Sequence, residues 1–115
     1  MDNDFHVDPV PWFQQRDQAT HLSSLEQAMW VNRAVRFVYQ EDGEDIRNGV
    51  VYPYGLVAKT TIWYLVGESE GKIQVLRVSK FHTIEITEQT FICPKEFDVA
   101  HFWKEWCREK EAYVS

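Results

Sequence analysis

The side chains best suited to chemistry in this sequence are the cations and tyrosines of its central part. Residues 33–80 carry seven basic and six acidic side chains, a local charge of +1, whereas the remainder carries five basic and twelve acidic ones. The six acids stand in two apparent turns, EDGED and GESEGK, so the strands between them are locally basic. Lysine and arginine bind phosphate, and aromatic rings stack on nucleic-acid bases. These residue types allow a phosphate-binding face despite a net charge of −6.

Each of these side chains also has a purely structural interpretation. A basic residue such as Arg77 or Lys80 is either a ligand contact, a solvated charge, or an ion-pair partner of Glu85 or Glu88. The tyrosines offer stacking surfaces or simply pack in the core and the turns, and this applies to Tyr39, Tyr52 and Tyr54.

Sites of catalysis and metal binding are not indicated. The four histidines lack paired ligand spacing, as do the two cysteines Cys93 and Cys107, and the sequence holds no glycine-rich phosphate loop, GxSxG or paired-carboxylate motif. We therefore expect no enzyme activity, no metal and no cofactor. No secretion signal or apolar run of membrane-spanning length is present, so we expect a cytoplasmic chain with reduced thiols.

The elements that position these residues belong to one domain of 115 residues. Residues 1–19 resemble a polar arm, 20–110 form the domain, and 111–115 form a tail. Apolar residues at helical spacing predict a helix over 21–32, with Thr20 as its N-cap. A second amphipathic helix is predicted over about 98–109, with Asp98 as its N-cap.

Between the helices, period-two patterns predict five or six short strands over about 34–87. Strands are expected over about 34–40, 45–52, 55–59, 61–67, 73–79 and 82–87. Asn48-Gly49 is a hairpin signal, but EDGED already supplies a turn, so we place Gly49 at a bulge. YPYG is expected to bend the chain because Pro53 cannot donate a ladder hydrogen bond. Sequential strands without helices between them predict a small antiparallel barrel or a strongly curled sheet.

The strand TTIWYLVGES has bulky residues on both faces. Because strand side chains alternate, Trp63 and Leu65 point one way and Tyr64 points the other. Trp63 and Leu65 are expected in the core. Tyr64 is expected either to contact a ligand or to lie under a helix.

These motifs together resemble the WYL domain, named for the triplet found here as Trp63-Tyr64-Leu65. The likeness runs from about residue 20 to 107 and includes RAVRFVYQ, the segment YPYGLVAKTTIWYLVGESEGKIQVLRVSKFHTIEIT and the closing FDVAHFWKEW. The resemblance implies a mainly β fold, an Sm-like, SH3-type barrel with an N-terminal and a C-terminal helix.

The same resemblance implies a function in bacterial transcription regulators. In that family the domain senses a nucleotide-like or single-stranded nucleic-acid effector, follows a helix-turn-helix DNA-binding domain and often dimerises. Residues 1–19 are too few for a helix-turn-helix domain, so we expect either an excised domain or a stand-alone version. The alternative is a dimerisation or domain-coupling module without a ligand.

The family pattern carries over unevenly to the candidate binding residues. Arg77 and Tyr64 match the strand arginine and the motif tyrosine, while Lys80 stands where arginine is usual. Two positions that are often basic in relatives are Gly49 and Gln74 here. The candidate ligand-binding residues are therefore Tyr64, Arg77 and Lys80, with Lys59 and Arg47 as auxiliary charges and Tyr52 as a stacking surface.

Overall fold

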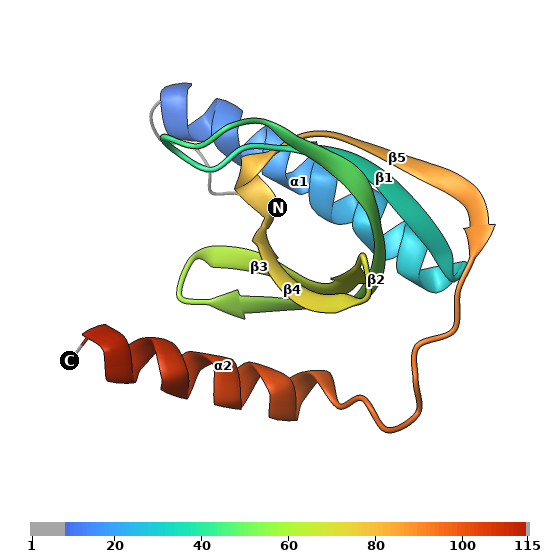
Figure 1. Ribbon diagram of the computed structural model, residues 1–115. Helices are drawn as coiled ribbons and strands as arrows, with labels where there is room; N and C mark the ends of the chain where they lie inside the picture. Colours follow the sequence, from blue (N-terminus) through green and yellow to red (C-terminus); the bar gives the residue numbers. More distant parts are fainter. Residues whose placement is uncertain (1–8, 115) are drawn as a thin grey trace.

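The computed structural model describes the backbone of residues 9–114 and the side chains of residues 18–110. Two helices flank a five-stranded sheet (Figure 1). In chain order the elements are α1 (Pro9–Trp30), β1 (Arg33–Tyr39), β2 (Arg47–Lys59), β3 (Ile62–Ser69), β4 (Lys72–Arg77), the 3-10 turn η1 (Val78–Lys80), β5 (Phe81–Thr90) and α2 (Val99–Val114). The predicted mainly β class with two helices is confirmed.

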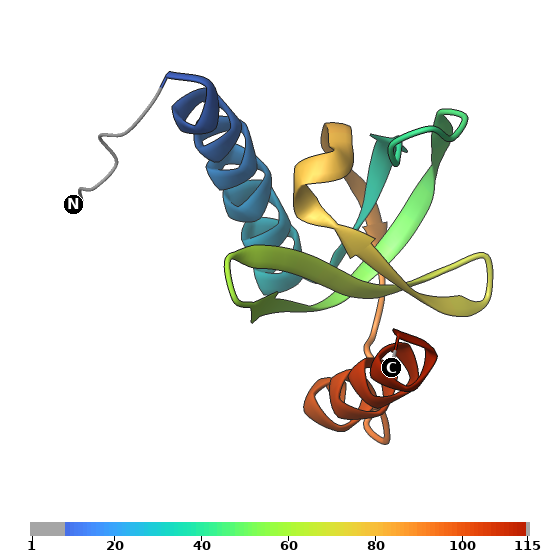
Figure 2. The same cartoon turned by 90° about the vertical axis from the view of Figure 1, so that its left-hand side faces the viewer.

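The five strands form one antiparallel sheet in the order β4-β3-β2-β1-β5. The sheet curls strongly (Figure 2). As a result, the short η1 connects β4 at one edge of the sheet to β5 at the other edge. In the described part of the chain, no ladder joins β4 to β5. The sheet is therefore open, and of the two predicted forms the curled sheet describes it, while a closed Sm-like barrel is not confirmed.

Strand β2 is continuous where the sequence predicted two strands and a bend. Its first part pairs with β1 and its second part with β3, and the register shifts between Pro53 and Gly55. The predicted bulge at Gly49 is wrong, since Gly49 pairs regularly with Phe37. Pro53 cannot donate to a ladder, so the irregularity falls next to the proline, where β2 changes partner.

Two other boundaries differ from the predictions. Helix α1 begins at Pro9, so part of the expected arm is helical and Thr20 lies inside the helix. The sequence pattern does not predict this start, because the large apolar residues of 9–19 cluster in VPWF and do not recur at helical spacing, although proline is a common first helical residue. Strand β4 ends at Arg77, and η1 replaces the end of the strand predicted over 73–79.

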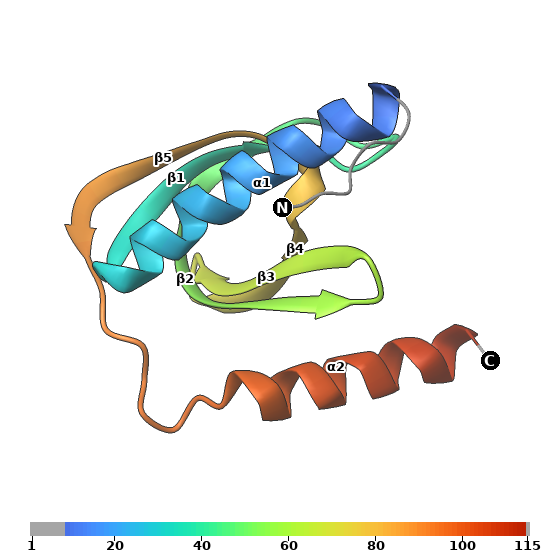
Figure 3. The same cartoon turned by 180° about the vertical axis from the view of Figure 1, so that it is seen from behind.

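The core lies between α1 and the concave face of the sheet. In Figure 3, α1 crosses β1 and β5, and α2 lies on the opposite side, below β3. His21 of α1 donates a hydrogen bond from Nε2 to the carbonyl of Phe81 (3.0 Å). Leu65 is fully buried and Trp63 packs against the core, as predicted. The buried core consists of Leu25, Ala28, Val35, Phe37, Tyr39, Val51, Leu65, Leu76, Val78 and Phe81.

Helix α2 covers the outer face of β2 and β3. Asp98 caps its start as predicted, because its Oδ1 accepts from the backbone N–H of His101 (3.1 Å). Gly55 of β2 leaves just enough room for Val99, since a Cβ added at Gly55 would stand 2.8 Å from Cγ1 of Val99. The helix thus shields aromatic side chains on the face that points away from the core.

Candidate anion-binding site

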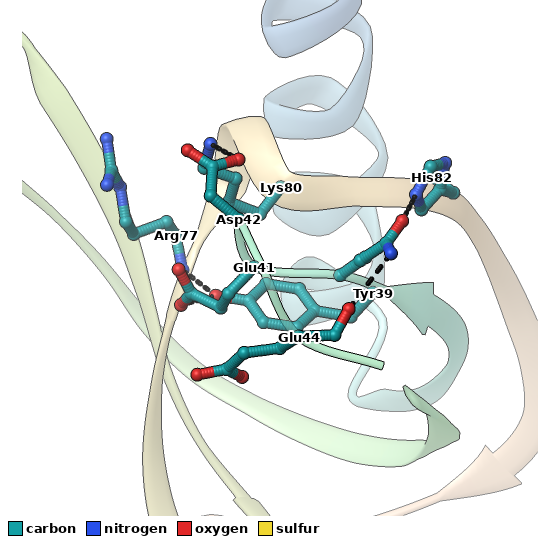
Figure 4. A network of polar contacts seen from close by, with 8 residues as sticks. Tyr39, Glu41, Asp42, Glu44, Arg77, Lys80 and His82 are labelled. Atoms are coloured by element: carbon teal, nitrogen blue, oxygen red, sulfur yellow. Dashed lines mark hydrogen bonds and ion pairs between the residues drawn. The ribbon is translucent and has the colours of Figure 1, made fainter. Parts of the chain in front are cut away.

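A buried tyrosine stands at the centre of the site. Tyr39 is the last residue of β1 and is fully buried. Its hydroxyl accepts from the backbone N–H of Arg77 (3.0 Å) and donates to Oε2 of Glu41 (2.5 Å), as Figure 4 shows. Burial, followed by the hydrogen bond to Glu41, raises the pKa of Tyr39. The hydroxyl therefore stays protonated and ties the end of β4 to the turn after β1.

That turn, residues 41–45 with the sequence EDGED, is called the acidic turn below. It is held by the backbone N–H of Glu44, which donates to the carbonyl of Glu41 (3.1 Å), and Gly43 has a φ of +76°. The Gln40 amide donates to the Glu44 carbonyl (3.0 Å) and its Oε1 accepts from Nε2 of His82 (3.1 Å). The acidic turn thus has a fixed place beside η1.

The acidic turn forms an ion pair with η1. Nζ of Lys80 lies 2.9 Å from Oδ1 of Asp42, and the lysine side chain is 21% exposed while the aspartate side chain is 91% exposed. The hydrogen bond and the charge of Lys80 lower the pKa of the Asp42 carboxyl, and the charge of Arg77 adds to the effect. Two cations therefore act on one carboxylate at the surface.

Arg77 lies at the C-terminal end of β4. It is paired with Tyr64 in the β3–β4 ladder, and residues opposite each other in a ladder share one face of the sheet. Its Nε is buried and has no hydrogen-bond partner among the described residues. Buried polar atoms are nearly always hydrogen-bonded, so the unpartnered Nε of Arg77 is an exception that needs an explanation.

A hollow of about 440 Å³ opens between the acidic turn and η1. Lys80 supplies a cation to its wall and Asp42 a carboxylate. The remaining lining residues are Gln40, Glu41, Gly43, Ser79, Phe81 and His82. The wall thus offers both donors and acceptors of hydrogen bonds.

Three of the six predicted binding residues gather around Tyr39. Besides Arg77 and Lys80, the guanidinium of Arg47 lies over the Tyr39 ring, 5.6 Å from its centroid. Arg47 also donates to Oε1 of Gln74 (2.8 Å), one of the positions where the family pattern has a basic residue. Arg47 is thus already engaged by neighbouring side chains.

The other three predicted residues lie elsewhere. Tyr64 packs under α2, with ring centroids 5.0 Å from Trp103 and 5.8 Å from Trp106. Tyr52 stacks on Phe91 at 5.4 Å, and its hydroxyl accepts from Nε2 of Gln89 (2.8 Å). Lys59 is the last residue of β2. Only Tyr64, through its pairing with Arg77, adjoins the cluster around Tyr39.

The sequence did not single out the residues that hold this cluster. The sequence patterns indicate Tyr39 only as a stacking or packing residue, and they indicate EDGED only as a connection between two strands. Asp42 and Lys80 are 38 residues apart, and no local pattern predicts such a contact. The one available signal was the high density of carboxylates in EDGED beside a strand that ends in Tyr39 and Gln40.

Within the residues described, no three His, Cys, Asp or Glu side chains form a group that could hold a metal ion. In the described part of the chain, no helix is long and apolar enough to cross a membrane.

Comparison with known proteins identifies a family and similar solved structures. The family model of the WYL domain matches residues 20–86. Among solved structures, the chain is similar to proteasome accessory factor B/C (PafBC) of Arthrobacter aurescens, with 30% sequence identity and a TM-score of 0.68. The match covers 74% of this chain and 14% of that chain, so this chain spans only a small part of its relative. No curated protein matches the sequence.

Proposed function

The chain belongs to the WYL domain family, and on that premise we propose that it is the non-catalytic regulatory domain of a bacterial transcriptional regulator. It binds a nucleotide or single-stranded nucleic-acid effector at the cations around Tyr39. In the parent regulator, effector binding changes how an attached helix-turn-helix domain engages its operator. The length of PafBC, of which this chain matches 14%, is consistent with such additional domains.

The observation that carries the proposal is the unpartnered Nε of the Arg77 guanidinium. This nitrogen is buried and lacks an acceptor among the described residues. A phosphate oxygen is a strong acceptor, and hydrogen bonds between ionised groups are about twice as strong as neutral ones. Lys80 follows on η1, and the charges of Lys80 and Arg77 both lower the pKa of the Asp42 carboxyl, which supports a site where two cations attract one anion.

Tyr64 has a supporting role in this proposal. It shares a face with Arg77 and is covered by α2, so it fixes the strand from which Arg77 projects. Tyr52 is outside the proposed site, because it stacks on Phe91 and accepts from Gln89. Lys59, the last residue of β2, is not assigned to the site.

The test is anisotropy of a labelled single-stranded oligonucleotide of mixed sequence, measured over a series of salt concentrations. For single strands, each phosphate contact contributes about 0.7 to the slope of log K against log salt. We expect Arg77→Ala and Lys80→Ala each to flatten the slope by about this amount and to weaken binding.

The matched control is Arg36→Ala, which removes the same charge from an exposed arginine that is 2.7 Å from Glu85. It should leave the slope as in the wild type. Equal slopes in Arg77→Ala, Lys80→Ala and Arg36→Ala would refute the assignment of the site.

A second candidate function is dimerisation or coupling to other domains without a ligand. It is favoured by two exposed apolar side chains, Trp30 at 87% and Ile92 at 88%. The backbone N–H of Phe91 donates to the carbonyl of Asn32 (3.0 Å), which holds the segments that carry them together. If this function is the correct one, sedimentation at tens of micromolar shows a dimer that Trp30→Ala with Ile92→Ala dissolves, and oligonucleotide binding is absent.

A further inference from the structure

We propose that Asp42 is an internal competitor of the effector, which occupies Lys80 in the unliganded protein and must leave before a phosphate can bind there. This inference rests on the proposed function, because it concerns regulation of the same site. The acidic turn then sets the effector concentration at which the domain responds.

The first support is the asymmetric exposure of the ion pair. The Lys80 side chain is 21% exposed and belongs to the wall of the hollow, whereas the Asp42 side chain is 91% exposed. The carboxylate therefore reaches the lysine from the solvent side, which is the direction from which a ligand must come. It places an anionic oxygen 2.9 Å from Nζ, a distance typical of a bound phosphate or carboxylate.

The second support is that the acidic turn is anchored through the neighbours of Asp42 and not through the Asp42 carboxylate. Glu41 is tied to the Tyr39 hydroxyl, and its carbonyl accepts from the backbone of Glu44. The backbone thus presents Asp42 to Lys80 in one place, which reduces the entropy lost when the pair forms. The anchors do not involve the Asp42 carboxylate, so its side chain can swing away while the turn stays in place.

The third support is the strength of such a pair. Exposed ion pairs stabilise weakly, and a phosphate carries more charge than a carboxylate, so it can displace the single carboxylate of Asp42. The contact is therefore strong enough to lower affinity and too weak to prevent binding.

The experiment compares Asp42→Asn with Glu44→Gln. Both variants remove one negative charge from the acidic turn. Among the described residues, however, Lys80 forms its ion pair with Asp42 and not with the Glu44 side chain. The probes are the labelled oligonucleotide and inorganic pyrophosphate. We expect Asp42→Asn to lower the dissociation constant about two- to fivefold for both probes and to steepen the salt slope. Glu44→Gln should change the dissociation constant by less than about twofold, because it acts only through the long-range effect of its charge.

A double variant shows where the gain arises. In a Lys80→Ala background, Asp42→Asn should no longer improve binding, because the competition is for Lys80. A gain that persists without Lys80, or an equal gain in Glu44→Gln, would overturn the competitor role while leaving the proposed function intact.

The two probes separate the remaining outcomes. In one outcome, Asp42→Asn binds pyrophosphate more tightly than the wild type does, and neither of these two proteins binds the oligonucleotide. This result supports the competitor role of Asp42 and refutes a nucleic-acid effector. Binding of neither probe by either protein at low salt refutes both proposals.

Discussion

At the scale of single residues, the Tyr39 hydroxyl holds the site together. It joins the backbone of Arg77 to the side chain of Glu41, although these residues belong to different elements. Tyr39 lies on the same buried face of β1 as Val35 and Phe37, because strand side chains alternate. The sequence could not reveal the hydroxyl partners, since the bond to Arg77 spans 38 residues.

The first prediction concerns this hydroxyl. Tyr39→Phe leaves the Arg77 N–H and the Glu41 carboxylate without their partner, and we expect a loss of about 1–3 kcal/mol in the free energy of unfolding. Tyr54→Phe is the matched control, because it removes the bond from the Tyr54 hydroxyl to Oε1 of Glu68 (2.6 Å), which no backbone group shares. Urea unfolding measures both. An equal loss in the two variants would contradict the central role of Tyr39.

The second prediction concerns the pKa of Asp42. Lys80 lowers it from its ordinary value of 3.8, so in Lys80→Ala it should rise toward that value. The folded pKa lies below the unfolded one, so the stabilising effect of the pair is present above about pH 4 and lost as the pH falls through the folded pKa. NMR titration of the Asp42 carboxyl gives the value directly. Lys72→Ala should leave it low, and a low pKa in Lys80→Ala would refute the pairing in solution.

At the scale of elements, β2 gives the sheet its curl. The first part of β2 pairs with β1 and the second part pairs with β3. The register of the β2–β3 pairing shifts between Pro53 and Gly55. Period-two patterns predicted both parts of β2 but treated them as separate strands. Local sequence did not place the bulge, because Gly49 and Pro53 are both plausible positions and only the pairing partners decide between them.

The third prediction tests this crossing. Gly67 of β3 lies opposite Pro53, and a Cβ added there would stand 2.5 Å from the carbonyl oxygen of Tyr52. Because backbone cannot move aside easily, Gly67→Ala should cost about 1–3 kcal/mol in the free energy of unfolding. Gly49→Ala should cost less than about 0.5 kcal/mol, since its Cβ would meet Phe37 only at 3.6 Å. Thermal or urea unfolding measures the stability of the two variants. Similar stabilities of Gly67→Ala and Gly49→Ala would contradict the close approach of Gly67 to the Tyr52 carbonyl.

At the scale of the whole molecule, the sequence predicted the class of fold and the inward and outward faces of the WYL triplet. It also predicted α2 and its cap at Asp98, because these features depend on local periodicity and capping. Of the predicted binding residues, the structure brings Arg47 and Arg77 to Tyr39 and Lys80 to the acidic turn, while Tyr52 stacks on Phe91. Which cations converge depends on the curl of the sheet, and no local pattern encodes the curl.

The order of the sheet also has a consequence for folding kinetics. The β2–β3–β4 pairings join neighbours in the chain, but β1 must also find β5, and the Thr87 hydroxyl reaches the Ala34 carbonyl across 53 residues. Local hairpins close quickly, whereas a long loop must first lose much of its entropy. The contact between Asp42 and Lys80 belongs to this late closure, so the proposed site forms only once β1 and β5 have paired. We therefore expect a ligand bound at the proposed site to stabilise the pairing of β1 with β5 by mass action.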